Sequence, residues 1–205
     1  MRADLANDIL RLTAEHLELV LSAMLVAILL GVPGGILISR VARLRKWALG
    51  FASVMQTIPS LALFGILIPI PLIGGIGTRT VIVSLVLYAL LPILRNTYVG
   101  ISSVDPAVCE SAVAMGMTDG QVLRMVRLPL AAPTILAGIR IAAVTTIGTA
   151  TIAAAIGGGG LGVFIFRGVA SVDSTQTLAG ALPAAVMALL ADGGLGWIER
   201  RLSAF

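Results

Sequence analysis

The sequence has little of what a soluble or metal-dependent protein needs. Charged residues make up 12% of its 205 residues, whereas about 25% is usual for a soluble domain. A single cysteine, Cys109, excludes a disulfide framework and a cysteine metal cluster within the chain. A single histidine, His16, excludes a metal site built from several histidines. So few charges are not enough to cover the surface of a water-soluble fold.

What is present points to a membrane. Hydrophobic residues make up 58% of the chain, and they form continuous runs of about 20 residues, the length of a spanning helix. Membrane β-barrels instead show alternating segments of about ten residues. We therefore predict an all-α integral membrane protein with a single transmembrane domain over residues 1–205. No internal repeat and no long linker divides the chain.

The first 16 residues are mixed and polar, and they lack the compact basic start and short apolar core of a signal peptide. Leu5, Ile9, Leu12 and, less regularly, Leu17 fall on one helical face. This spacing favours an amphipathic helix on the outer membrane surface.

Five spans follow from the apolar runs. The second contains Pro59, the third Pro92 and the fifth Pro183, which spanning helices tolerate and at which they bend. The predicted spans cover residues 17–39, 47–70, 80–99, 133–156 and 177–198.

Lysine and arginine fix the predicted orientation. If the polar stretch between the third and fourth spans is cytoplasmic, ten of the 14 basic residues fall on that side. The amino terminus is then outside and the carboxyl terminus in the cytoplasm, as an odd number of spans requires. The net charge of +4 is explained by this topology and needs no nucleic-acid partner.

The polar stretch reads DPAVCESAVAMGMTDGQVLRMVRLP and begins at Asp105. Asp105 before Pro106 is typical of a helix start, with an N-cap and a proline in the first turn. Gly116 predicts a left-handed end to that helix. Thr118 and Gln121 match a capping box, so a second short helix is expected to run to about Leu128 and stop at Pro129.

Three interpretations of this stretch are open from its residues. It is a capped, solvated loop, or a helix-turn-helix that reads DNA, or a docking element for a soluble partner. The DNA interpretation is disfavoured by only two arginines and by the tether to two spans. Small side chains that let a partner approach closely favour docking; they are Ala107, Ser111, Ala112 and Ala114.

The stretch resembles the signature of the membrane subunits of bacterial ABC importers. That signature is Glu-Ala-Ala, three residues, Gly, nine residues, then Ile-x-Leu-Pro. Here Glu110, Ser111 and Ala112 are followed at the same spacing by Gly116 and by VRLP at 126–129. The resemblance implies a coupling helix that docks on an ATP-binding subunit. The implied contact residues are Asp105, Pro106, Ala107, Glu110, Ser111, Ala112, Ala114, Met115 and Gly116, and the signature ends at Leu128 and Pro129.

Three further stretches are similar to permeases of osmoprotectant importers: QTIPSLALFGILIP (56–69), LYALLPILRNTYVGI (87–101) and IGGGGLG (156–162). This resemblance implies the five-span type I importer fold in a bacterial inner membrane and a substrate such as glycine betaine, carnitine, choline or proline betaine. It also implies separate partners. These are ATP-binding subunits that hold ATP and magnesium, a second permease (self or paralogue), and an external substrate-binding protein.

Two groups of polar residues are candidates for the translocation path. One lies beside Pro59 and the other in the fourth span, where helical threonines otherwise bond their own backbone. Gln56 needs a partner, either water in the path or a neighbouring helix. The candidates are Gln56, Thr57, Ser60, Thr145, Thr146 and Thr149. Arg140, also in the fourth span, is interpreted as a snorkelling residue.

No catalytic constellation is apparent, so the chain is not expected to hydrolyse ATP. The GGGGLG run lacks the Lys-Ser/Thr of a phosphate loop and is interpreted as an outer turn that passes close to another segment. Cys109 is interpreted as a packing residue. Two alternative functions stay open: import of another small solute, such as an amino acid, and a membrane anchor without a transport role.

Overall fold

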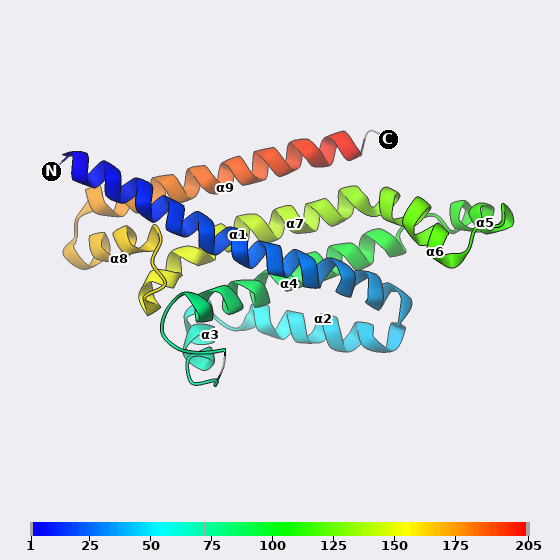
Figure 1. Cartoon of the computed structure of the whole chain (residues 1–205), viewed down its shortest axis with the longest axis horizontal. Helices are drawn as coiled ribbons and strands as arrows, with labels where there is room; N and C mark the ends of the chain where they lie inside the picture. Colours follow the sequence, from blue (N-terminus) through cyan, green and yellow to red (C-terminus); the bar gives the residue numbers. More distant parts are fainter. Residues whose placement is uncertain (1, 72, 204–205) are drawn as a thin grey trace.

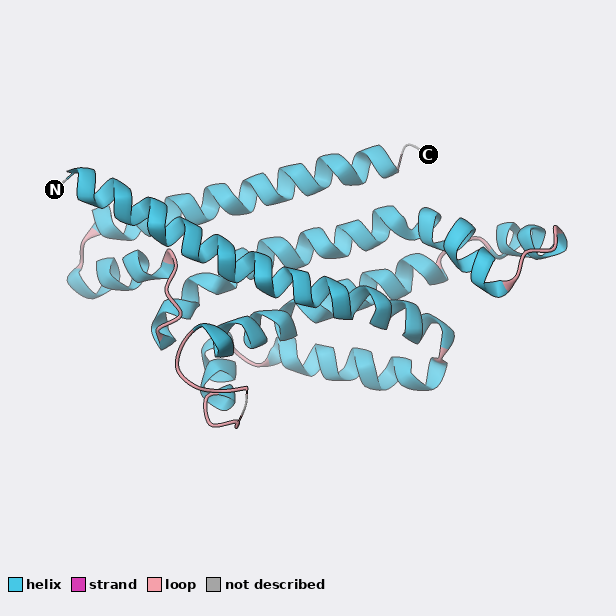
Figure 2. Ribbon diagram, viewed as in Figure 1, coloured by secondary structure: helices cyan, strands magenta, loops and turns pink. Residues whose placement is uncertain are grey.

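The computed structural model describes the backbone of residues 2–71 and 73–203 and the side chains of residues 6–71 and 73–203. Helices and turns build this part of the chain, and it contains no β-strand (Figure 2). Four helices are long and apolar enough to cross a membrane, and a bent pair makes five if it is counted as one span. The predicted all-α membrane class is confirmed.

The first helix, α1 (Arg2–Arg40), is a single rod of 39 residues. At 1.5 Å per residue it is roughly 58 Å long, about twice the hydrocarbon thickness of a bilayer. The predicted surface arm is therefore not a separate helix. Its apolar face packs on protein: Ile9 and Leu12 join Leu161 and Phe164 in a small cluster. The side chain of Leu5 lies outside the described residues.

The second apolar run is broken at Pro59 instead of crossing as one helix. Helices α2 (Ala42–Thr57) and α3 (Ser60–Leu67) meet at 107°. Ile58 and Pro59 are both extended, with ψ of 127° and 138°. The proline ring disfavours a helical residue before it, and two extended residues in succession turn the chain sharply.

The other three predicted spans agree with the structure to within a few residues at most ends. They correspond to α4 (Thr78–Ser102), α7 (Leu128–Ala150) with the 3-10 turn η2 (Thr151–Ile156), and α9 (Ser174–Leu202). Prolines inside α4 and α9 do not break these helices. A short helix, α8 (Gly162–Ser171), lies between η2 and α9.

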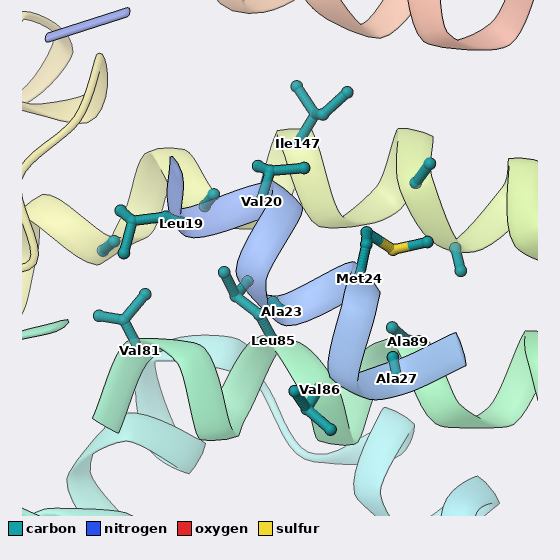
Figure 3. Close-up of a cluster of buried hydrophobic side chains, with 14 of the residues drawn as sticks. Leu19, Val20, Ala23, Met24, Ala27, Val81, Leu85, Val86, Ala89 and Ile147 are labelled. Atoms are coloured by element: carbon teal, nitrogen blue, oxygen red, sulfur yellow. The ribbon is translucent and has the colours of Figure 1, made fainter. Parts of the chain in front are cut away.

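The main core lies where α1 crosses α4 and α7 (Figure 3). Alanines at the crossing, among them Ala23, Ala89 and Ala142, are fully buried and let the helices approach closely. At Gly138 the approach is closer still, because a Cβ atom there would lie 2.7 Å from the Pro92 carbonyl oxygen. The small residues of the fourth span therefore serve helix packing.

The long helices lie side by side along the molecule, and the segment between α4 and α7 projects beyond them at one end (Figure 1). This segment contains α5 (Pro106–Ala114), α6 (Asp119–Gln121) and the π-helical turn η1 (Val122–Arg127). The described start of α1 and α8 lie at the opposite end, and α9 runs from that end toward the projecting segment (Figure 1). One end of the molecule is thus formed by α5, α6 and η1, and the other by α8 and the described start of α1.

Candidate functional site

The projecting segment, residues 105–127, starts with the cap that the sequence predicts. The Asp105 carboxylate accepts a hydrogen bond of 2.9 Å from the backbone N–H of Ala107, and Pro106 occupies the first turn of α5. Proline has no N–H to leave unpaired at this position. The start of α5 is therefore fixed by three consecutive residues.

The end of α5 is a Schellman turn built on Gly116. Its φ is +89°, a left-handed conformation that favours glycine. The backbone N–H of Met117 donates to the Ala112 carbonyl, and that of Gly116 donates to the Val113 carbonyl, at 3.2 and 2.8 Å. The predicted left-handed end is confirmed, and it reverses the chain within a few residues.

The next helix begins with the predicted capping box. The backbone N–H of Thr118 donates to the Gln121 side-chain oxygen at 2.8 Å, and the Thr118 hydroxyl bonds the same oxygen at 3.0 Å. Beyond Gln121 the structure departs from the prediction, because the helix does not stop at Pro129. It continues through η1 into α7, so residues Asp119–Ile156 form one 38-residue rod.

The π-helical turn explains how this rod passes Pro129. In an α-helix the proline ring would clash with the carbonyl four residues earlier, and the missing N–H would leave that carbonyl unpaired. In η1 the N–H of Leu128 instead bonds the Leu123 carbonyl, five residues back. The wider turn moves the carbonyls out of register and gives the ring room.

The segment is anchored by a small apolar cluster on its inner side. Cys109, Ala112 and Val122 are buried there, with Met117 and Val126 packed around them. The predicted packing role of Cys109 is confirmed. Ala112, predicted as part of the contact face, is only 2% exposed and faces inward, because η1 must pack against it.

The opposite face of the segment is open to solvent. Met115 is 74% exposed there. Apart from Ala112, the predicted contact residues are all exposed, and two of them, Glu110 and Ala114, also line the cavity described next. The exposed ones are Asp105, Pro106, Ala107, Glu110, Ser111, Ala114, Met115 and Gly116. The segment presents small and apolar side chains together with two carboxylates.

A cavity of about 720 Å³ lies behind α5, between it, the end of α1 and η1. Its lining includes two residues of each charge, namely Arg40, Arg127, Glu110 and Asp119. One guanidinium nitrogen of Arg40 donates to the Asp119 carbonyl at 3.4 Å, which joins α1 to the projecting segment.

The six candidate path residues do not form one site within the chain. Gln56 donates to the Tyr88 carbonyl at 2.8 Å, so its partner is a neighbouring helix, and the Tyr88 hydroxyl donates to the Ile58 carbonyl. Thr57 bonds its own helix, as does Thr145, through the Val54 and Ile141 carbonyls respectively. Thr146 is buried, whereas Thr149 and Ser60 are half-buried. Helix α4 packs against both groups and lies between them.

Sequence reasoning missed a site at the other end of α7, around His16. This side chain is fully buried, and its Nε2 atom lies 3.1 Å from the Ile147 carbonyl oxygen. That carbonyl is free because the N–H of Thr151, at the start of η2, bonds the Gly148 carbonyl instead. His16 therefore satisfies a carbonyl that the change from α-helix to 3-10 helix leaves open.

The glycine run packs against the same part of α1, as predicted for a closely passing turn. The N–H of Gly160 donates to the Glu15 carboxylate at 3.3 Å. A Cβ atom on Gly160 would lie 3.1 Å from Nδ1 of His16, and one on Gly158 would lie 2.6 Å from Val81. Two neighbouring residues of α1 thus hold both η2 and the turn that follows it. We call the end of the molecule opposite the projecting segment its outer end, and this set, Glu15, His16, Ile147 and Gly160, the outer latch.

Arg140, interpreted from the sequence as a snorkelling residue, forms ion pairs with α9. Its Nε atom donates to Asp192 at 2.7 Å and its Nη1 atom to Glu199 at 3.0 Å, both on α9. No local sequence pattern predicts this contact, because the two partners lie 52 and 59 residues from Arg140.

Comparison with known proteins gives three concordant results. Residues 23–204 match the family described as binding-protein-dependent transport system inner membrane component. The chain is 49% identical over 190 residues to the carnitine transport permease protein OpuCD of Listeria monocytogenes, covering 92% of this chain and 84% of that protein. It is 50% identical over 190 residues to the glycine betaine/carnitine/choline transport system permease protein OpuCD of Bacillus subtilis, covering 92% and 82%.

Solved structures agree in fold. The inward-facing MetNI methionine ABC transporter has a chain that superposes with a TM-score of 0.87 at 23% identity, covering 98% of this chain and 99% of that one. At this identity the likeness concerns the fold alone, and it confirms the predicted type I importer fold.

Proposed function

Because the chain belongs to the family of binding-protein-dependent transport system inner membrane components, we propose that it is the permease subunit of an ATP-driven importer for quaternary-ammonium osmoprotectants. The identity of about half its residues with permeases named for carnitine, glycine betaine and choline carries this proposal. The methionine importer shares the fold at 23% identity, so it supports the importer architecture but says nothing about the substrate of this chain.

The projecting segment is the proposed docking site for the ATP-binding subunit. Its exposed face lies at one end of the bundle, and small side chains beside Glu110 suit a helix that sits in a groove of an ATP-binding subunit. Residues Asp119–Ile156 form one rod, so a displacement of the segment moves α7 with it. Closure of two ATP-binding subunits would then change the packing of α7 against α4 and α1.

The proposed assembly contains partners that this chain needs for transport. Two ATP-binding subunits hold ATP and magnesium and carry out hydrolysis. A second permease, either another copy or a paralogue, completes the path around a twofold axis, and an external binding protein delivers the substrate. The projecting segment and the carboxyl end of α9 face the cytoplasm of a bacterial inner membrane, and the amino terminus faces outward.

Reconstitution tests the substrate and the motor together. In the purified assembly in lipid nanodiscs, we expect glycine betaine or carnitine, delivered on the binding protein, to stimulate ATP hydrolysis, and methionine to have no effect. Stimulation by methionine alone would overturn the substrate assignment. Failure to copurify any ATP-binding subunit would overturn the importer assignment.

A matched pair of variants tests the docking of the projecting segment on the ATP-binding subunit. We expect Glu110→Ala to weaken copurification with the ATP-binding subunit while membrane insertion stays normal. Glu18→Ala, which removes an exposed carboxylate at the opposite end of the molecule, should leave copurification unchanged. Labelling of a cysteine introduced at Ser111 should occur only from the cytoplasmic side, and labelling from outside would contradict the orientation.

A further inference from the structure

Helices α7 and α9 pack through apolar side chains, among them Ala191 and Leu195 of α9, and the polar part of their contact centres on one guanidinium group. Arg140 on α7 reaches Asp192 and Glu199, which lie about two turns apart on α9, through two different nitrogens. A planar fork with two carboxylate partners fixes both the rotation and the height of one helix against the other. No other side-chain hydrogen bond or ion pair between these two helices is found among the described residues.

Helix α9 is otherwise the least embedded of the long helices. Its most apolar window is 11% buried, compared with 56% for the window of α4. The three charged side chains are partly exposed, with 34% for Arg140, 49% for Asp192 and 26% for Glu199. The ion-paired cluster therefore adds a directional restraint to the apolar packing that holds α9.

The stretch of α9 between the two carboxylates is rich in glycine. Gly196 has a reason to be small, because its Cβ atom would lie 2.9 Å from Nη1 of Arg140. Gly193 and Gly194 have open space around them, so packing does not require glycine there. Glycine weakens a helix interior, and three within four residues make this an easily bent part of α9, in addition to Pro183.

We propose that Arg140 is a positioning residue for transport: it clamps α9 across its glycine segment, so that the carboxyl-terminal part of α9 follows α7 when the projecting segment moves. Asp192 and Glu199 are the fixed points on α9, and Gly193 and Gly194 form the hinge between them. This inference rests on the proposed importer function, because α7 carries the motion of the motor only if the segment is gripped.

Neutralising the clamp should separate transport from hydrolysis. We expect Arg140→Gln to lower substrate taken up per ATP hydrolysed about tenfold, because the two charge-assisted hydrogen bonds to α9 are lost. Arg140→Lys keeps the charge but lacks the fork, and it should retain an intermediate ratio. Arg95→Gln, an exposed arginine on α4, is the matched control and should leave the ratio unchanged.

A triple variant distinguishes positioning from stability. Arg140→Gln alone leaves two carboxylates without their counter-charge, and the chain is expected to lose thermal stability. In Arg140→Gln with Asp192→Asn and Glu199→Gln no charge is left unpaired, so stability should return toward that of the wild type. We expect uptake per ATP to stay low in the triple variant. Recovery of wild-type uptake together with stability would overturn the proposal.

The hinge is tested by stiffening it. Gly194→Ala has room for its methyl group and should raise thermal stability but slow uptake, a combination that a purely structural glycine would not give. Gly50→Ala is the control: it also lies inside a helix, α2, with open space around it, and it should leave uptake unchanged. Faster or unchanged uptake by Gly194→Ala would overturn the hinge.

Hydrogen exchange tests the clamp independently of transport. In nanodiscs, amides of residues 193–199 should exchange at least several-fold faster in Arg140→Gln than in the wild type, while those of α4 do not change. Unchanged exchange would overturn the clamp even if the assembly imports osmoprotectants. If the exchange effect is present and no substrate is imported, the clamp stands and the proposed function fails.

Discussion

The two ends of α7 differ in helix type and in exposure. At one end the helix widens into the π-helical turn η1 and continues into a segment whose outer face is exposed. At the other end it tightens into the 3-10 turn η2, where the outer latch satisfies the freed carbonyl and holds the glycine turn. One end leaves side chains exposed, and the other is completed by the chain's own α1.

The two ends of α7 also differ in how firmly they are held to the rest of the chain. A buried carbonyl without a donor costs free energy, so the outer end is stable only while His16 and Gly160 stay in place. The projecting segment is continuous with α7, its own cluster packs α5 against η1, and Arg40 joins it to α1 by a hydrogen bond of 3.4 Å. We therefore expect a displacement of the segment to be passed to α7, while the outer latch holds the other end of that helix.

The largest effect is expected from Gly162→Ala at the outer end. Its Cβ atom would lie 1.8 Å from the Thr151 carbonyl oxygen, and backbone cannot yield as a side chain can. We expect destabilisation of more than about 3 kcal/mol, beyond the usual range for an overpacked site, and little folded protein. Size-exclusion profiles and thermal unfolding in detergent measure it. Gly148→Ala, with open space around it, is the control, and equal melting temperatures would contradict the packing.

Gly116→Pro should give the next largest effect, and on activity instead of folding. Proline cannot adopt the φ of +89° at this position, and the bond from the Gly116 N–H to the Val113 carbonyl is lost. We expect a normally inserted bundle, association with the ATP-binding subunit weakened at least about tenfold and ATPase uncoupled from uptake. Gly120→Ala in α6 has open space and serves as the control. Normal uptake by Gly116→Pro would refute the gripped-end interpretation.

His16→Ala should lower stability by about 2–4 kcal/mol, because it leaves the buried Ile147 carbonyl without a donor and opens a cavity. Thermal unfolding measures this loss. His16→Gln retains an N–H donor and should recover part of it, whereas Leu17→Ala, on the exposed side of α1, should have a small effect. If glutamine is no better than alanine, the hydrogen bond is not the source of the stability.

The smallest effect concerns Asp173, which caps α9 at the outer end. Hydrogen bonds from the backbone of Gln176 and Thr175 lower the pKa of its carboxyl group below the ordinary value of 3.8. Its contribution to stability is thus complete above that value and is lost as the pH falls through the lowered pKa. We expect Asp173→Asn to reduce the loss of melting temperature in acid. An unchanged acid profile would contradict this role.

The sequence predicts the local features of the projecting segment well. The caps at Asp105 and Gly116 and the capping box at Thr118 depend on residues within a few positions of one another, so a short stretch contains the whole signal. The predicted helix end at Pro129 is wrong. The π-helical turn before Pro129 changes which carbonyl each N–H bonds, and no residue in this stretch marks that change. Pro59 marks a bend, but its angle of 107° also depends on the extended Ile58.

The contacts that join distant parts of the chain could not be predicted. His16 meets the Ile147 carbonyl across 131 residues, and Arg140 meets Asp192 across 52. From the sequence, a lone histidine and a lone arginine in apolar runs give no indication of their partners. Gln56 is the reverse case. The sequence predicts that this side chain has a partner and leaves open whether it is water or a neighbouring helix, and the structure shows the Tyr88 carbonyl in that place.

The wide turn η1 also makes the projecting segment sensitive to chain length. A π-helical turn holds one residue more than the α-helical turn it replaces. Deleting one residue between Val122 and Arg127 would restore α-helical hydrogen bonds, and the ring of Pro129 would then clash with the backbone one turn earlier. We therefore expect a deletion in η1 to be more disruptive than most single replacements, although every side chain of α5 would stay intact.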